Sequence, residues 1–405
     1  MAVDPCTAGL EVYLVGGAVR DALLGRAVVE RDWVVVGATP EVMESRGFRP
    51  VGKDFPVFLH PETHEEYALA RTERKTGRGY HGFSFHAAPD VTLEDDLVRR
   101  DLTVNAMAQR PDGTLVDPFS GHADLEARLL RHVSDAFQED PVRILRLARF
   151  TARYAPLGFR PADETKYLCQ RMVADGEVDH LVPERVWQEL DKTLTEPCPS
   201  AFFRVLRDCG ALARLIPELD GAFTREITTV AGHRVNAGDH ALAAVDTAAK
   251  VDGADGPVKL ALVLGALDRD DLAPGHARSA CQRLRTPNAY RALTLTYAAH
   301  RNTAHAADAL GAEGMLQLLE ACDAFRRPER FSAFLLAVSV DAVTAGTADT
   351  VTDYPPTRRL QACLDATRDI SGGRFAKAGL KGPAIAEAVQ KERLRAIERL
   401  PRPGD

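Results

Sequence analysis

The sequence contains no run of about 18 apolar residues, the length that a membrane-spanning helix requires. Its seven cysteines are scattered, odd in number and form no C-x-x-C pair, which argues against a disulfide framework and against a cysteine zinc site. The formal net charge is -7, so the chain lacks the basic character of a general nucleic-acid coat, and an RNA partner would need a local positive patch. The N-terminus lacks the basic and apolar regions of a secretory signal, which predicts a cytoplasmic protein without membrane association.

At 405 residues the chain is long enough for two or more domains. Up to residue 137 the pattern alternates between short strands and helices. From about residue 139 apolar residues recur at helical spacing and β-rich runs disappear, so the remainder is predicted to be all-helical.

One stretch, residues 14–37, reads as a strand, a Gly-Gly turn, a short helix and a second strand. The second strand is predicted to open with Glu30 and Asp32, whose side chains point to the same side of a strand. Two carboxylates so placed can hold the magnesium ion that phosphoryl transfer requires. Glu66, on a neighbouring predicted strand, is a third and weaker candidate.

Together with the Gly-Gly turn, the carboxylate pair is a more specific indication of a phosphoryl-transfer site than it is alone. Gly17 permits close approach of a phosphate group, and Arg20 offers a fixed cationic fork. Neither a Walker loop nor a G-x-G-x-x-G fingerprint is present.

The segment RRDLTVNA, residues 99–106, lies in a predicted helix over 95–108. On a helix Asp101 and Asn105 share a face, which together with Arg100 could bind a ribose or a phosphate. For this pattern taken alone, a capped, charged helix start is the better explanation.

The segment EDPVRILRLAR, residues 139–149, reads as a helix with Asp140 as N-cap and Pro141 at its first position. Arg143 begins a series of arginines at intervals of three, continued by Arg146 and Arg149. A carboxylate beside a guanidinium can pair with the edge of cytosine or adenine, because the carboxylate accepts from an exocyclic amino group and the guanidinium donates to ring nitrogen or carbonyl. Uracil and guanine present a carbonyl to the carboxylate instead, so this pair could reject them.

Together these motifs resemble those of the bacterial class II tRNA nucleotidyltransferases, the CCA-adding enzymes. The similar segments are LVGGAVRDALLG…ERDWVVVG, RRDLTVNAMA, DPFSGHADLEARLLRHV and EDPVRILRLARF, which occur in the family's order between about residues 12 and 209. The resemblance implies a polymerase-β-like α+β head over residues 1–137, a helical neck over 138–222, and a helical body and tail over 223–405. It also implies addition of C, C and A to tRNA from CTP and ATP.

The resemblance assigns roles residue by residue. Glu30 and Asp32 correspond to the magnesium ligands and catalytic carboxylates. The implied nucleotide-binding residues are Gly17, Arg20, Arg100, Asp140, Arg143, Arg146 and Arg149. The face shared by Asp101 and Asn105, inferred from their spacing, is predicted to join them. A basic, glycine-rich stretch over 71–82, with Arg71, Arg74 and Lys75, matches the family's flexible loop, which helps the switch from C to A addition. Glu184-Arg185 matches a further motif, which we interpret as structural support for the neck.

The chain departs from the family in two places. Glu30 stands where the family usually has aspartate; the charge and oxygen ligands are retained, so we expect activity to be retained. Close relatives carry a His-Asp metal-binding doublet in the C-terminal half, and here Gly265-Ala266 occupies that place. None of the twelve histidines is followed by aspartate, so phosphohydrolase activity is predicted to be absent.

Three other functions remain open from the sequence. A bacterial poly(A) polymerase has the same head, although the C-terminus here is not strongly basic. Enzymes that add only CC or only A are also consistent with the motifs, as is a non-catalytic RNA-binding relative. The sequence does not identify the tRNA-binding residues, and a monomer is favoured without a specific signal.

Overall fold

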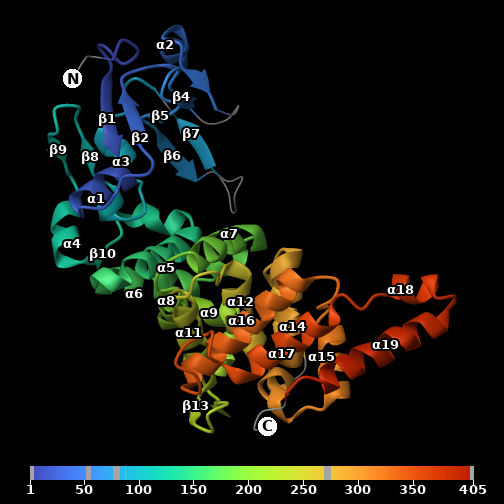
Figure 1. Ribbon diagram of the computed structural model, residues 1–405. Coiled ribbons are helices and arrows are strands. Elements are labelled where there is room, and N and C mark those ends of the chain that lie inside the picture. The colour runs from blue at the N-terminus through green and yellow to red at the C-terminus, as the bar shows by residue number, and fades with distance from the viewer. Residues whose placement is uncertain (1–3, 52–55, 76–82, 87, 269–274, 402–405) are drawn as a thin grey trace. The chain divides into compact units, whose positions relative to one another are not determined.

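The computed structural model describes residues 4–51, 56–75, 83–86, 88–268 and 275–401 (Figure 1). The chain divides into two compact units. They comprise Met1–Glu189 with Arg204–Arg214, and Leu190–Phe203 with Leu215–Asp405. The predicted three-part division of the chain stays a prediction. Across the described ranges, no helix combines the length and apolar character needed to cross a membrane.

The first unit contains a seven-stranded sheet in the order β3-β4-β5-β2-β1-β8-β9. Neighbouring strands are antiparallel except β2 and β5, which are parallel. The strands are β1 (Glu11–Val15), β2 (Asp32–Val36), β3 (Arg49–Pro50), β4 (Val57–Leu59), β5 (Glu66–Leu69), β8 (Ala108–Gln109) and β9 (Leu115–Val116).

Alternating side chains of the central strands build an apolar core on each face of this sheet. Val12 and Val35 pack with Met43 of helix α2 (Pro40–Ser45). Tyr13 and Val34 point to the opposite face, into the cluster that includes Leu97 of α3. The two-residue period of a strand therefore explains why both faces are covered by apolar groups.

The segment predicted as a flexible loop begins as regular structure. Strand β6 (Thr72–Lys75) pairs antiparallel with β7 (Phe83–His86), outside the seven-stranded sheet. The expectation that the loop starts at Arg71 is thus wrong for this stretch, and residues 76–82 lie outside the described residues.

Helices dominate the rest of the chain, which confirms the predicted fold class. Those up to residue 222 are α1 (Gly17–Leu23), α2, α3 (Leu93–Leu97), α4 (Gly121–Ala127), α5 (Val142–Tyr154), α6 (Asp163–Ala174), α7 (Pro183–Leu194), α8 (Ser200–Asp208), α9 (Ala211–Leu215) and α10 (Pro217–Ala222). The later ones are α11 (Ala237–Ala248), α12 (Gly256–Leu264), α13 (His276–Arg283), α14 (Asn288–His305), α15 (Ala312–Ala321), α16 (Pro328–Ala345), α17 (Pro355–Thr367), α18 (Gly372–Lys377) and α19 (Pro383–Glu398).

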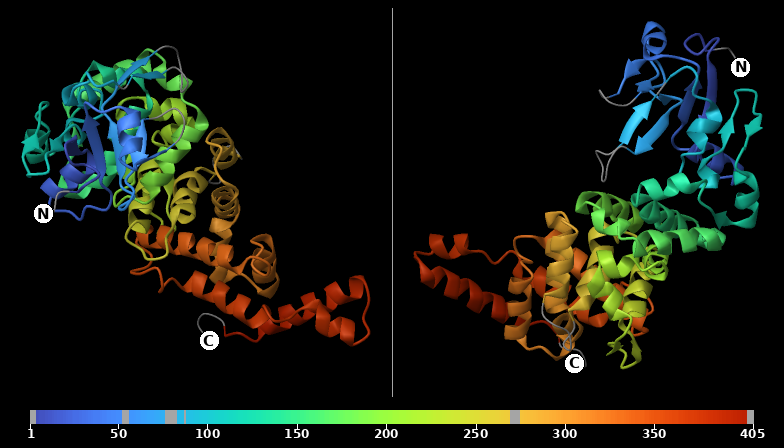
Figure 2. Two further views of the ribbon diagram at one scale, coloured as in Figure 1. Left: turned by 90° about the horizontal axis from the view of Figure 1, so that it is seen from above. Right: turned by 180° about the vertical axis from the view of Figure 1, so that it is seen from behind.

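In the second unit, α12, α14 and α16 pack side by side around one apolar cluster (Figure 2). The prediction that this region is entirely helical needs one correction. Strands β12 (Glu226–Thr228) and β13 (Arg234–Asn236) form a hairpin where a loop was expected. Its short strands carry too little apolar alternation to stand out in the sequence.

Candidate active site

The turn between β1 and α1 depends on Gly16, whose backbone has φ 67° and ψ -125°. Residues with a side chain are sterically excluded from this region. A Cβ here would also lie 2.8 Å from Nη1 of Arg100. The neighbouring Gly17 has ordinary backbone geometry as the first residue of α1, and a Cβ there would meet Arg20 at 3.5 Å. Gly16 is therefore the glycine that the turn requires, and the predicted role of Gly17 at the triphosphate stays a prediction.

These two glycines give a matched stability test. Gly16→Ala is expected to lower the free energy of unfolding by about 1–3 kcal/mol, because it forces a side chain into a conformation reserved for glycine. Gly17→Ala is expected to change it by less than about 1 kcal/mol. Urea denaturation of both variants measures the difference, and equal values would contradict this account of the turn.

Arg20 is buried and held by groups on three segments. Its Nε and Nη2 donate to the two carboxylate oxygens of Asp21 at 3.0 and 3.1 Å, and its Nη1 donates to the side chain of Asn105. Its guanidinium lies over the rings of Phe150 and Tyr154, 5.2 and 5.1 Å from their centroids. The residue predicted to contact the triphosphate is thus already oriented by α1, by the RRDLTVNA segment and by α5.

The predicted metal carboxylates lie at one edge of the sheet. Asp32, the first residue of β2, pairs in parallel register with Glu66, the first residue of β5, so their side chains project on the same face. Glu30 precedes the strand, so the prediction that it begins β2 is wrong. Partial desolvation raises the pKa of Asp32, and the nearby Glu30 carboxylate raises it further, while Arg100 opposes the shift. Carboxylate oxygens are the ligands that Mg²⁺ takes in proteins, so Glu30, Asp32 and Glu66 suit this ion by donor type.

The segment around Asp101 is not the helix predicted over 95–108. Helix α3 ends at Leu97, and only a short 3-10 turn, Thr103–Asn105, follows. The two side chains nevertheless lie together, because Nδ2 of Asn105 donates to Oδ1 of Asp101 at 3.0 Å, and their role at the nucleotide stays a prediction. The other carboxylate oxygen of Asp101 accepts from Nε of Arg146 at 2.7 Å.

Burial alone would raise the pKa of Asp101, but the charge of Arg146 and the hydrogen bonds from Asn105 and Arg146 lower it to about 2. Because the pKa of Asp101 is lower in the folded state than in the unfolded state, its ionisation stabilises the fold at pH values above the unfolded pKa. That stabilisation is lost as the pH falls through the folded pKa. With an unfolded pKa near 3.9 the contribution is about 2–3 kcal/mol.

The wild-type free energy of unfolding is therefore expected to fall by about 2 kcal/mol between pH 5 and pH 2 through Asp101 alone. Asp101→Asn should remove that part of the pH dependence and lower stability at pH 7. Chemical denaturation at several pH values measures both effects. An unchanged acid slope in the variant would contradict the role of this ion pair.

The two residues predicted to read the base, Asp140 and Arg143, bind different protein groups. Asp140 accepts a two-armed salt bridge from Arg185, with Nη1 to Oδ1 at 3.0 Å and Nη2 to Oδ2 at 2.7 Å. The guanidinium of Arg143 donates to the carbonyls of Ala136 and Arg99 at 2.8 and 2.7 Å. Helix α5 begins one residue later than predicted, with Pro141 rather than Asp140 as its N-cap.

The third arginine of the predicted series is also held by an acid. Arg149 donates from Nε to Glu189 of α7 at 2.6 Å, and both side chains are buried. These three arginines of α5 therefore do not form a solvated stripe, because each is bound to other protein groups. Nothing in their spacing could have identified Asp101 and Glu189, which are 45 and 40 residues away from their arginines along the chain.

Arg100 lies beside the Gly-Gly turn. Its Nη2 donates to Asp96 at 3.2 Å and its Nη1 to the carbonyl of Asn105 at 3.4 Å. Its predicted contact with the nucleotide stays a prediction. The same holds for the loop residues Arg71, Arg74 and Lys75, the last two of which belong to β6.

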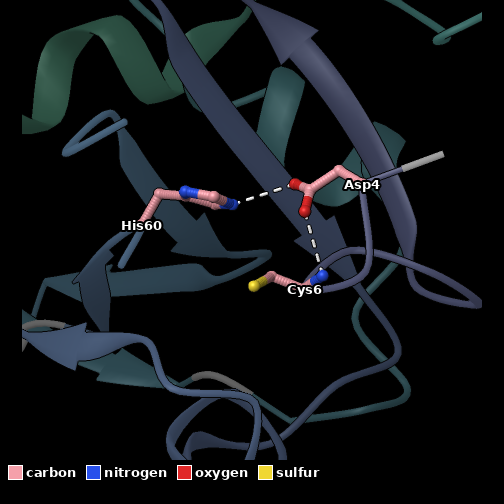
Figure 3. Close-up of side chains that lie close together, drawn as sticks. All are labelled: Asp4, Cys6 and His60. Atoms are coloured by element: carbon pink, nitrogen blue, oxygen red, sulfur yellow. Dashed lines mark hydrogen bonds and ion pairs between the residues drawn. The ribbon is translucent and has the colours of Figure 1, made fainter. Parts of the chain in front are cut away.

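A second group of possible metal donors lies at the N-terminal segment (Figure 3). Asp4, Cys6 and His60 bring their donor atoms within 4.8 Å of one another. Nδ1 of His60 accepts from the backbone N–H groups of Glu62 and Thr63 at 3.2 Å, so the neutral ring carries its proton on Nε2 and donates it to Asp4 at 2.9 Å. A metal on Nε2 would move that proton to Nδ1, where two donors already point. The group therefore anchors the N-terminal segment and does not fit a metal.

The position of the missing His-Asp doublet is filled by close helix packing. A Cβ on Gly265 would lie 2.8 Å from the ring of Tyr297 and 3.0 Å from the carbonyl oxygen of Thr294, both in α14. Arg301, also in α14, donates to the carbonyl of Gly265 at 2.7 Å. A histidine side chain has no room at residue 265 in this arrangement.

The same helical region contains a buried hydrogen-bond network. Asp341 of α16 contacts His240 of α11 at 2.7 Å through one oxygen and His305 of α14 at 3.0 Å through the other. The second ring nitrogen of His305 lies 2.8 Å from the hydroxyl of Tyr354. These donor atoms satisfy one another and join three helices, which supports the interpretation of His240 as a structural residue.

We expect the purified protein to show no nickel-stimulated hydrolysis of a 2′,3′-cyclic nucleotide. Gly265→His combined with Ala266→Asp should not create this activity and should lower the free energy of unfolding by about 1–3 kcal/mol through overpacking against α14. Gly373→Ala, where a Cβ meets no atom within 4 Å, is the control. Metal-stimulated hydrolysis by the wild-type protein would overturn the prediction.

The chain is similar to two protein-family models. One, described as the poly A polymerase head domain, matches residues 12–131. The other, described as a probable RNA and SrmB-binding site of polymerase A, matches residues 158–223. The first match covers the sheet and the carboxylates, and ends before α5.

Curated relatives match over almost the whole chain. The multifunctional CCA protein of Alkalilimnicola ehrlichii is 55% identical, with 97% of this chain and 98% of the relative covered. That of Halorhodospira halophila is 53% identical, with the same coverage. Among solved structures, the Bacillus stearothermophilus CCA-adding enzyme in complex with CTP is 22% identical with a TM-score of 0.67, covering 96% of this chain and 89% of that one. At this identity the solved structure shows a shared fold.

Proposed function

Because this chain belongs to the family of the multifunctional CCA proteins, we propose that it adds C, C and A to the 3′ end of tRNA from CTP and ATP. No nucleic-acid template takes part. We place the reaction in the cytoplasm, where its substrates occur, and expect the chain to act as a monomer.

One observation carries the proposal beyond family membership. A continuous series of side-chain contacts runs from Arg20 through Asn105 and Asp101 to Arg146. It joins the Gly-Gly turn, where a triphosphate would bind, to the helix that begins beside Asp140, where a base would be read. Both elements lie within the first unit, so one nucleotide could contact both.

In the proposed reaction the 3′-hydroxyl oxygen of tRNA attacks the α-phosphate of the nucleotide. A new O–P bond forms, the bond from the α-phosphate to the bridging oxygen breaks, and pyrophosphate leaves with its electron pair while the hydroxyl proton passes to solvent. Arg20 and Arg100 provide positive charge for the triphosphate, and the backbone at Gly16 and Gly17 permits its close approach.

Glu30 and Asp32 are the residues that would hold Mg²⁺, with Glu66 next to Asp32 on the adjoining strand. The bound ion would lower the pKa of the attacking hydroxyl and neutralise charge on the triphosphate. The chain's own part is to hold Asp32 and Glu66 at one edge of the sheet, with Glu30 just before β2.

Base selection is proposed to depend on Asp140 and Arg143. The carboxylate accepts from the amino group of cytosine or adenine, and the guanidinium donates to the neighbouring ring atoms. The loop residues Arg71, Arg74 and Lys75 are proposed to assist the change from C to A addition.

The test is incubation of the protein with tRNA that ends at the discriminator base, together with labelled CTP, ATP and Mg²⁺. Three added nucleotides followed by arrest support the proposal. Arrest after CC, or addition only to tRNA that already ends in CC, would indicate a partial enzyme. No incorporation would indicate a non-catalytic RNA-binding relative.

A poly(A) polymerase is the second candidate, because the head matches the family model of that description. With ATP as the only nucleotide, a poly(A) polymerase extends RNA into a long ladder. A CCA-adding enzyme adds a single A, and only to tRNA that ends in CC.

A further inference from the structure

Several hydrogen bonds from the protein hold the carboxylate of Asp140 in place. Its Oδ1 accepts from Nη1 of Arg185 at 3.0 Å and from the backbone N–H of Val142 at 3.1 Å. Its Oδ2 accepts from Nη2 of Arg185 at 2.7 Å. The planar guanidinium fork therefore fixes both the position and the plane of the carboxylate.

These contacts leave a specific acceptor position open. A carboxylate has about four lone-pair positions, two on each oxygen. The described contacts occupy both positions of Oδ1 and one of Oδ2. The remaining position on Oδ2 is the one from which Asp140 can accept a hydrogen bond from a nucleotide.

Helix α7 supplies this fork from a rigid position. Arg185 and Glu189 lie four residues apart on α7, so they share a face of the helix. Arg185 binds Asp140 at the start of α5, and Glu189 binds Arg149 two turns further along α5. Because both contacts join the same two helices, the ion pair of Arg149 with Glu189 helps to hold α7, and with it Arg185, against the start of α5.

We propose that Arg185 is a positioning residue for nucleotide selection, which acts by holding Asp140 as an acceptor-only carboxylate with one open position on Oδ2. This inference rests on the proposed base-reading role of Asp140, and it gives Arg185 a function beyond support of the helical neck. An amino group of cytosine or adenine can donate to the open position. A carbonyl of uracil or guanine meets the same lone pair and is repelled.

Without the fork, the carboxylate of Asp140 can rotate and present other lone pairs. It can then turn away from the carbonyl of UTP, which relieves the repulsion that excludes this nucleotide. Loss of Arg185 should therefore allow the protein to use UTP, and not only weaken its use of CTP.

The experiment compares Arg185→Lys and Arg185→Gln with the wild-type protein. The ratio of kcat/KM for CTP to that for UTP is measured on tRNA that lacks CCA. Binding of CTP and UTP without tRNA is measured in parallel, so that selectivity is obtained even if turnover is absent. Arg185→Lys retains the charge but not the fork, and we expect it to reduce the CTP-to-UTP ratio about tenfold.

Arg131→Lys is the matched control, because Nε of Arg131 contacts both oxygens of Asp124 at 3.1 and 3.0 Å away from the proposed base-reading residues. It should affect stability but not the CTP-to-UTP ratio. In an Asp140→Asn background, Arg185→Lys should no longer change the ratio, because Arg185 acts through Asp140.

Two results would overturn the proposal. One is an unchanged ratio in both Arg185 variants with a lowered melting temperature, which would leave Arg185 a purely structural role. The other is a change in the CTP-to-UTP ratio on Arg185→Lys that is equally large in the wild-type and in the Asp140→Asn background. Failure of the wild-type protein to incorporate CMP would overturn the proposed function separately, while the binding ratio would still test Arg185.

Discussion

Replacement of Asp32 by alanine is expected to lower the rate of CMP incorporation into tRNA by about a thousandfold or more. Asp32 begins β2 directly opposite Glu66, and its partial burial raises its pKa. A cation at this edge stabilises the charge that develops on the transferred phosphoryl group by several kcal/mol, and each 1.36 kcal/mol corresponds to a tenfold rate. Single-turnover incorporation of labelled CMP measures the effect.

Substitutions of Glu30 test which side chains support activity at the first predicted metal-ligand position. Glu30→Ala should cause a loss of the same order, whereas Glu30→Asp should retain activity within about tenfold, because charge and oxygen ligands are kept. Glu62→Gln, at an exposed position, should leave the rate unchanged. Wild-type rates in Glu30→Ala would show that Glu30 is not a metal ligand.

Much of the first unit could be predicted from local patterns. Short β-rich runs indicated β1, β2, β4 and β5, and the Gly-Gly pair indicated the turn before α1. Glu30 and Asp32 were selected because side chains two residues apart share one face of a strand, but β2 begins only at Asp32. Asp101 and Asn105 were expected to share a helix face, whereas they lie together at a 3-10 turn.

The partners of charged side chains could not be predicted. Arg185 and Asp140 are 45 residues apart, and so are Arg146 and Asp101. No local periodicity encodes such pairings, because they depend on how the helices pack. Gly16 could be distinguished from its neighbour only once its positive φ and its contact with Arg100 were known.

In the helical region, the structure gives a physical reason for a motif that the sequence lacks. The sequence showed that the His-Asp doublet was missing, and the structure shows that α14 packs onto Gly265 where a side chain would lie. The buried contacts of His240 and His305 with Asp341 use donor atoms that a metal would otherwise need. In this chain, the place of the doublet is thus occupied by packing of α14 onto Gly265, and the absence of phosphohydrolase activity stays a prediction.

Substitution of Asp140 by asparagine is expected to reduce the CTP-to-UTP ratio of kcat/KM by about a hundredfold. The amide keeps the size of the side chain but replaces one acceptor oxygen with an N–H₂ donor. That donor can bind O4 of uracil, and a correct pair of base-edge hydrogen bonds contributes about 1–3 kcal/mol of discrimination. At 1.36 kcal/mol for each factor of ten, the upper part of this range corresponds to the expected change.

The measurement uses tRNA lacking CCA with CTP or UTP as the only nucleotide, and scores the first addition. Asp124→Asn, which weakens the comparable contact with Arg131, should lower stability without admitting UTP. The Asp140 variant should also incorporate UMP at a rate above that of the wild-type protein, because it gains a favourable contact rather than only losing one. A variant that loses CTP and UTP activity in equal proportion would show that Asp140 positions the helix and does not read the base.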